Sequence, residues 1–279
     1  MALRRHYNKL FARRRLRAMR GALGDIVPSA VVLFIVGFLV WRGVDNLEYK
    51  WRWRRIPGYF LREEEGEWIA GPLLEGLALT LQISALAALG ALAFGVCAVG
   101  ASFCRMRSLR MLARCYTALM RGTPLLVQLY LFYFMFGNIL GLERLAAGVL
   151  ALALFEGAFA AEIIRAGVAA VPRGQVEAAL SLNLRPADKW LRVILPQAAP
   201  LVLPPLANLC VSLIKHSSIV TVIALGDLTN NARNLATETF LTFEIWFSVG
   251  ALYVLLCFPA ARLVAFAERK MLRRWMPQR

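Results

Sequence analysis

Residues able to act as catalytic groups or metal ligands are scarce in this sequence. It contains two histidines, His6 and His216, which are far apart, and its five cysteines form no Cys-x-x-Cys pair. Neither a metal site nor a disulfide framework is therefore indicated, and a membrane enzyme would lack a clustered nucleophile and base. No Gly-x-x-x-x-Gly-Lys-Ser/Thr motif occurs, so the chain does not itself supply a P-loop ATPase.

Acidic residues are also few. There are 17 of them against 33 Lys and Arg, which gives a formal net charge of +16. Such a balance can indicate nucleic-acid binding, but most of the basic residues flank apolar runs, as the positive-inside rule for membrane proteins expects. We therefore expect no nucleic-acid partner.

The alternating pattern of a transmembrane β-barrel is absent, and long apolar runs are present instead. Hydrophobic residues make up 59% of the chain, and several runs reach the roughly 20 residues that a helix needs to cross a bilayer. Backbone polar groups cannot stay unpaired in lipid, so such runs must be helical. The sequence predicts an all-α, polytopic helical membrane protein.

A topology of six spans with both termini in the cytoplasm places most of the Lys and Arg residues on the cytoplasmic side, as the positive-inside rule requires. We expect a basic N-terminal arm, a first span and an outer loop in residues 1–71. A core of five spans follows in 72–270, and 271–279 form a basic cytoplasmic tail. The predicted spans are 25–41, 72–103, 116–136, 145–164, 201–225 and 243–266.

The cytoplasmic loop at 165–200 is polar and helix-like. Pro172 precedes a first short helix, and Asn183 suits the left-handed residue that ends it. Pro186 suits the first position of a second helix, which Pro196 is expected to close. Two short helices joined by a tight turn would form a compact knob that fits either its own bundle or a groove in a partner.

This loop resembles the EAA loop of permease subunits of bacterial ABC importers of type I. The residues that carry the resemblance are Glu177, Ala178, Ala179, Asn183, Ile194, Leu195 and Pro196, with Asn183 where the family has glycine. Asparagine tolerates the left-handed conformation nearly as well as glycine.

Four further segments resemble the polar amino-acid branch of that family, the histidine, glutamine and glutamate permeases. In chain order they are GLALTLQISALAA, YTALMRGTPLLVQLYLFYF, EGAFAAEIIRAGVAAVPRGQVEAA and LPPLANLCVSLIKHSSIVTVIALGDLT. In the last segment His216 stands where Asp or Asn is common. The resemblance covers about residues 72–270.

The resemblance implies a multi-pass permease of the bacterial cytoplasmic (inner) membrane that forms the pathway for ATP-driven import of a polar amino acid. It implies a dimer of ABC ATPase subunits, which bind the ATP and Mg, and no cofactor in this chain. It also implies a second permease subunit, identical or a sister, an external amino-acid-binding protein and membrane lipid. The EAA loop would be the coupling helix that fits a cleft on the ATPase.

Ionisable residues within the spans suggest a place for the substrate. Glu156 lies near the middle of the fourth span, and Lys215 and His216 lie past the middle of the fifth, followed by Ser217 and Ser218. Our hypothesis is that Glu156 attracts the ammonium of an amino acid, while Lys215, the neighbouring hydroxyls and Gln128 meet its carboxylate. The alternative is that these residues pair with one another to hold the bundle together.

A further motif, Arg121, Gly122, Thr123 and Pro124, begins the third span near the inner surface. A break in the helix there would suit part of a gate, and the start of a helix with a snorkelling Arg121 is an equally good interpretation. Glu162 and Arg165, three residues apart, are expected to form a local structural pair.

A secondary transporter is the remaining alternative. It would need coupling within one chain, usually through inverted repeats of similar spans. We find no such repeat in the sequence, and six spans are few for that class.

Overall fold

The computed structural model describes residues 28–39, 41–43 and 49–275, and side chains up to residue 271. The predicted basic arm at 1–20 and the final residues 276–279 lie outside this part. The chain divides into two compact units, residues 1–51 and 52–279. Residues 52–71, which we expected to belong with the N-terminal region, are therefore part of the second unit.

The first unit contains an apolar helix over residues 28–43, of which residue 40 is not described. It falls largely within the first predicted span, 25–41, whose opening residues lie outside the described part. Its hydrophobic side chains are exposed, with Phe34 at 75%, and the rings of Phe34 and Phe38 stack at 6.5 Å. This helix therefore offers an apolar surface to lipid or to another protein.

The second unit begins with small elements that pack onto the spans. They are η1 (Trp53–Arg55), α2 (Pro57–Phe60) and an antiparallel hairpin of β1 (Leu61–Glu64) and β2 (Glu67–Ala70). Glu65 and Gly66 turn the hairpin with positive φ angles, as a two-residue hairpin turn requires. Buried Ile56 packs with Leu73 and Ile245 of the helices that follow, which ties this segment to the core.

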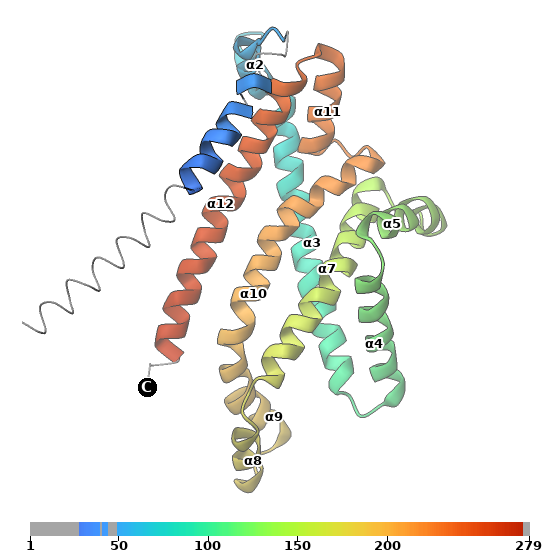
Figure 1. The fold of residues 1–279 in the computed structure, drawn as a ribbon. Helices are drawn as coiled ribbons and strands as arrows, with labels where there is room; N and C mark the ends of the chain where they lie inside the picture. Colours follow the sequence, from blue (N-terminus) through green and yellow to red (C-terminus); the bar gives the residue numbers. More distant parts are fainter. Residues whose placement is uncertain (1–27, 40, 44–48, 276–279) are drawn as a thin grey trace, which may run out of the picture. The chain divides into compact units, whose positions relative to one another are not determined.

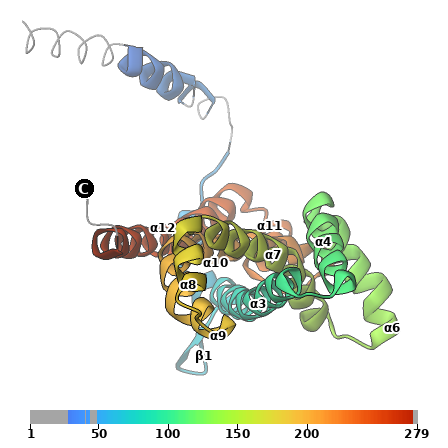
Figure 2. The same ribbon diagram turned by 90° about the horizontal axis from the view of Figure 1, so that it is seen from below.

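Four helices in the described residues are long and apolar enough to span a membrane. They are α3 (Pro72–Phe103), α7 (Arg144–Ala169), the continuous helix Pro186–Ile223, and α12 (Thr242–Trp275). The third of these comprises α9 (Pro186–Asp188), the π-helical η3 (Lys189–Ile194), α10 (Leu195–His216) and the 3-10 helix η4 (Ser217–Ile223). In Figures 1 and 2, α3 and α7 lie in the middle, α10 and α12 on one side, and α4 on the other.

The predicted third span, 116–136, is not one straight helix. Helix α4 (Arg107–Gly122) and the segment Leu125–Leu140 meet at an angle of 109°. That segment consists of α5 (Leu125–Tyr130), the π-helical η2 (Leu131–Gly137) and α6 (Asn138–Leu140). Thr123 is extended because it precedes Pro124, whose ring disfavours the helical conformation of the residue before it. Counted as one span, the bent pair brings the described residues to five.

The expected stop at Pro196 is also absent. The chain stays helical from α9 through Pro196 into α10. Proline has no amide hydrogen to donate to the preceding turn, and the wider π-helical turns of η3 stand immediately before it. The second helix of the loop and the fifth span are therefore one rod.

Small residues bring α3 and α7 into close contact. A Cβ added at Gly90 would lie 2.7 Å from the Cβ of Ala153, and one added at Gly95 would lie 2.8 Å from that of Ala160. Ala87 and Ala91 are fully buried on the same helix. Helices in lipid associate through such close backbone approach rather than through a hydrophobic driving force, so this contact is the centre of the fold.

The polar segment before the last span is largely helical. Helix α11 (Leu228–Thr239) begins at Asp227, whose side chain accepts hydrogen bonds from the backbone amides of Thr229 and Asn230. This is the standard cap of a helix N-terminus. Asp227 is fully buried, and its burial raises the pKa of its carboxyl to about 6.

Replacing Gly95 by Val should weaken the contact between α3 and α7. Its new side chain would meet Ala160 Cβ and, at 3.2 Å, backbone atoms of Ala161 and Gly157. Overpacking of this kind costs about 1–3 kcal/mol, and a lower melting temperature of the purified protein in detergent would report it. Gly100→Val, on the same helix with nothing within 4 Å of the new Cβ, is the control. Equal melting temperatures would contradict the proposed tight interface.

The raised pKa of Asp227 predicts a pH dependence of stability. Because the folded-state pKa of about 6 lies above the usual 3.8, the native protein binds the proton more tightly, and this contribution to stability is lost as pH rises through 6. Asp227→Asn keeps the cap without the charge. We expect the difference in melting temperature, variant minus wild type, to increase from pH 5 to pH 8. A difference that is constant over this range would refute the prediction.

Candidate functional site

The EAA loop forms a knob from one short helix and the first turns of the long helix that begins at Pro186, rather than from the two short helices that were expected. Helix α8 (Arg173–Ser181) follows Pro172, and Asn183 ends the turn with a φ of 51°. The amide of Leu184 donates to the carbonyl of Ala179 at 3.2 Å, and that of Asn183 to Leu180 at 2.9 Å. The left-handed residue predicted at 183 is thus present, and it closes the helix as a glycine would.

The interior of the knob is packed against the spans. Buried Ile194 and Ala198 form a cluster with Val171 and with Trp190. The Trp190 ring also meets the ring of Phe103, at the end of α3, edge to face at 5.2 Å. Ala179 faces inward and is buried, whereas Glu177 and Ala178 are exposed. The knob is therefore fixed to α7, α10 and α3, with Glu177 on its outer surface.

Three leucines on the outside of the knob were not singled out from the sequence. Leu180, Leu182 and Leu191 are 57%, 74% and 65% exposed. In the sequence they cannot be told from leucines of a buried core. The structure shows that they face outward, because Ala179 and Ile194 occupy the buried side of the knob. Figure 1 places α8 and α9 at the end of the second unit where the turn between α3 and α4 also lies. The outside of the knob thus carries three exposed leucines together with the exposed Arg173, Arg185 and Arg192.

Glu156 and His216 contact each other across two spans. His216 Nδ1 lies 2.5 Å from Oε1 of Glu156, which is 3% exposed, whereas the histidine side chain is 46% exposed. The contact with Glu156 occupies Nδ1 of His216 and leaves Nε2 outside it. The alternative of mutual pairing therefore applies to these two residues.

Lys215 and the following serines have different surroundings. Lys215 is exposed, and within the described residues no carboxylate pairs with it. Ser217 is buried and donates to the carbonyl of Ile214, and Ser218 donates to that of Lys215 at 2.6 Å. The serine hydroxyl hydrogens are thus used by the backbone at the junction of α10 and η4.

Gln128 holds the bend between α4 and α5. Its side-chain nitrogen donates to the carbonyl of Met120 at 2.8 Å, and to the carbonyl and hydroxyl of Thr123 at 3.2 and 2.6 Å. Gln128 is buried, and its Oε1 is the buried side-chain polar atom left without a partner within the described residues. The structure places Gln128 at the break itself.

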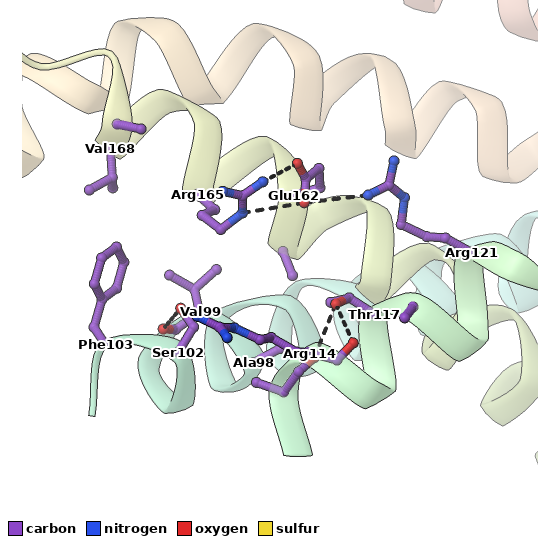
Figure 3. Close-up of a pocket in the computed structure, with 14 residues that line it drawn as sticks. Ala98, Val99, Ser102, Phe103, Arg114, Thr117, Arg121, Glu162, Arg165 and Val168 are labelled. Carbon is purple, nitrogen blue, oxygen red and sulfur yellow. Dashed lines mark hydrogen bonds and ion pairs between the residues drawn. The ribbon is translucent and has the colours of Figure 1, made fainter. Parts of the chain in front are cut away.

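Arg121 belongs to an ion-pair group that joins two spans. Glu162 of α7 is hydrogen-bonded by Arg165 and lies 3.4 Å from Nη1 of Arg121 at the end of α4, as Figure 3 shows. The guanidinium of Arg121 also stands 5.5 Å from the centre of the Phe159 ring. The expected local pair of Glu162 and Arg165 is present and extends to the motif at residues 121–124.

Comparison with known proteins identifies the kind of protein that carries this arrangement. The family described as "Binding-protein-dependent transport system inner membrane component" matches residues 91–273. The chain belongs to this family. Its resemblance to the permease subunits, inferred from the sequence, is confirmed.

Several curated proteins are similar to this permease. The probable glutamine ABC transporter permease protein GlnM of Bacillus subtilis is 35% identical over 199 residues, which is 71% of this chain and 92% of GlnM. The arginine transport system permease protein ArtQ of the same species is 37% identical, with 71% and 92% covered. The octopine transport system permease protein OccM of Rhizobium radiobacter is 34% identical, with 70% and 84% covered.

Solved structures share the fold of the permease. A crystal structure of an amino acid ABC transporter with histidines matches with a TM-score of 0.67 and 36% identity, covering 71% of this chain and 94% of that one. The MetNI methionine ABC transporter, in an inward-facing conformation, matches with a TM-score of 0.62 at 18% identity, covering 74% and 96%. The second likeness concerns the fold alone.

These matches establish the general role of the permease. It is an inner-membrane component of an amino-acid ABC import system, and it is not the ATPase of that system. Permease subunits of this kind bind no cofactor themselves. A binding-protein-dependent system implies ATPase subunits and a binding protein as partners.

Proposed function

We propose that the permease pairs with a second permease subunit, identical or a sister, to enclose a pathway for a polar amino acid. Exposed Lys215 and the exposed edge of His216 lie at the end of α10 in a membrane-spanning rod. Ionisable groups within spans face a protein interior or water rather than lipid. A second permease subunit facing Lys215 and His216, with a water-filled pathway between the two subunits, would meet that requirement. The relatives named for glutamine, arginine and octopine transport support a polar substrate.

The knob would dock on the ATPase through the EAA residues. The observation that carries this proposal is the exposed surface of Leu180, Leu182 and Leu191 on a knob whose inner side is packed against the spans. An apolar surface at the tip of a rigid element is suited to a groove in a partner. Glu177, exposed on the same helix, would add a charged contact at the edge.

Movement of the knob would be transmitted directly to the fifth predicted span, because the two share one helix. Ile194, Leu195 and Pro196 lie inside one continuous helix from Pro186 to Ile223. A displacement at the ATPase would then move α10 as a rigid body, which is the kind of transition expected for alternating access. In this proposal the core of the permease is 72–270, with the coupling loop at 165–200.

The geometry modifies the proposed substrate contacts. Glu156 is buried behind His216, so its effect on a substrate would pass through the histidine. Lys215, without a carboxylate partner in the described residues, would meet the substrate carboxylate. Ser217, Ser218 and Gln128 would shape the site, because their hydrogens are used locally.

The break at Arg121, Gly122, Thr123 and Pro124 would act in the gate. Gln128 fixes its angle from one side, and Glu162 of α7 holds Arg121 from the other. A change in the position of α7 relative to α4 would therefore act on the bend directly.

Leu182→Glu should uncouple the importer. A charge forced into an apolar interface, at a position this exposed, is expected to cost roughly tenfold or more in ATPase association. The measurement is ATPase activity of the complete importer in lipid, with and without loaded binding protein. We expect stimulation to fall in Leu182→Glu and in Glu177→Ala.

Met106→Glu is the matched control for the coupling test. Met106 is 59% exposed in the turn between α3 and α4, at the same end of the molecule but outside the knob. Full stimulation and normal ATPase co-purification in Leu182→Glu would refute the docking proposal.

Lys215→Met should raise the KM for import on the order of tenfold, because the substrate carboxylate loses a charge-assisted hydrogen bond. Glu156→Gln should have a smaller effect, since a glutamine can still meet His216. Arg262→Met is the control, because Arg262 lies in α12 against the Phe258 ring at 5.0 Å. Unchanged KM and rate in Lys215→Met complexes that assemble and hydrolyse ATP would contradict the substrate contact.

A further inference from the structure

A cavity of about 690 Å³ lies between α3, α4 and α7. It is at the end of the second unit that carries the knob, since Phe103 lines it and also contacts Trp190. Its walls include Val168 and Ala169, at the end of α7 shortly before α8. It is separate from Lys215 and His216, which do not line it.

Three arginines and one glutamate line this cavity. Glu162 is shared by Arg165 and Arg121, whereas within the described residues no carboxylate pairs with Arg114 of α4. Figure 3 shows Arg114 across the cavity from Arg165 and Glu162. With all four groups ionised, the lining has two positive charges in excess, which calls for an anion.

The remaining polar groups of the cavity offer acceptors rather than donors. The hydroxyl of Ser102 donates to the carbonyl of Val99 at 2.7 Å, and that of Thr117 to Ala113 at 3.1 Å. Their oxygen lone pairs stay available for a ligand's hydroxyl hydrogens. The floor is apolar, formed by buried Ala98, Val99 and Ala161. The cavity thus combines guanidinium groups, hydroxyl acceptors and an apolar wall.

We propose that this cavity binds the headgroup of an anionic phospholipid of the phosphatidylglycerol class. The arginines would hold the phosphate, the oxygens of Ser102 and Thr117 would accept from the glycerol hydroxyls, and the acyl chains would follow the apolar wall. Basic pockets between spans on the cytoplasmic side are typical sites for anionic lipid headgroups, and arginine suits phosphate through its paired donors. The cytoplasmic placement rests on the proposed function of the knob.

A lipid held there would join α3, α4 and α7, of which α3 and α7 contact the knob. It would hold Arg114 of α4 together with Arg165 of α7, and Phe103 of α3 forms part of the same wall. The lipid would therefore favour one arrangement of α7 against α4 and so influence coupling.

The test is photolabelling of the complete importer in nanodiscs of phosphatidylcholine with a small share of photoreactive phosphatidylglycerol. Labelled peptides from α3, α4 and α7 around the cavity are expected, and roughly tenfold less labelling in Arg114→Gln, since a charge-assisted contact to phosphate is lost. Arg114→Lys should retain most of the labelling. Arg107→Gln, an exposed arginine of the same helix outside the cavity, should label as the wild type does.

Two results would overturn the proposal. One is equal labelling by photoreactive phosphatidylcholine, or equal labelling in Arg114→Gln. The other is loss of labelling on addition of glycerophosphate or inorganic phosphate at millimolar concentration, which would assign the site to a free anion.

A separate control distinguishes this proposal from the coupling proposal. Leu182→Glu, which should lose ATPase docking, is expected to keep the lipid labelling. In liposomes with phosphatidylglycerol in one leaflet, labelling from the leaflet on the ATPase side is expected. Labelling from the opposite leaflet alone would contradict the proposal.

Discussion

The close contact between α3 and α7 is the constraint on which the rest of this permease depends. Gly90 and Gly95 bring the two backbones so near that added Cβ atoms would lie within 3 Å of alanines on the other helix. In lipid, where burying apolar surface gives no advantage over contact with acyl chains, this fit of small side chains supplies the attraction. The other elements of interest contact this pair of helices. The knob follows α7 in the chain, the bend is joined to α7 through Arg121 and Glu162, and α3 and α7 both line the cavity.

The firm placement of α7 allows it to carry two carboxylates with separate tasks. Glu156 and Glu162 are six residues apart on the helix and therefore point in different directions. Glu156 turns inward to His216, while Glu162 turns to Arg121 and Arg165. Helix α7 thus contacts His216 through Glu156 and Arg121, at the end of α4, through Glu162. A displacement of α7 would change both contacts together, and under the proposed function it would link the substrate contacts to the gate.

The sequence predicted features that depend on local chemistry and missed those that depend on tertiary contact. The bounds of the second span coincide with α3, and the left-handed turn at Asn183 and the helix start at Pro186 are present as expected. A break at Arg121–Pro124 was one of two interpretations that the sequence left open. Its angle of 109° was not predicted, because the residue before a proline indicates where a helix can break but not how the two parts are packed. Mutual pairing of the ionisable residues was one of two alternatives that the sequence left open. It did not indicate that His216, 60 positions away, is the partner of Glu156. The helix through Pro196 was also missed, since its π-helical turns have no sequence signature that we could recognise.

The continuous helix from Pro186 to Ile223 connects the knob with Lys215 and His216, the residues of the proposed substrate site. Its 38 residues correspond to about 57 Å of helix, whereas the hydrocarbon core is roughly 30 Å thick. The rod is therefore long enough to cross the membrane and still project well beyond it. Lys215 and His216 lie near one end, and the segment packed into the knob forms the other. The helix is continuous from one end to the other, although Pro200, Pro204 and Pro205 lie within it. Under the proposed function, a displacement of the knob would therefore be transmitted along this helix toward Lys215 and His216.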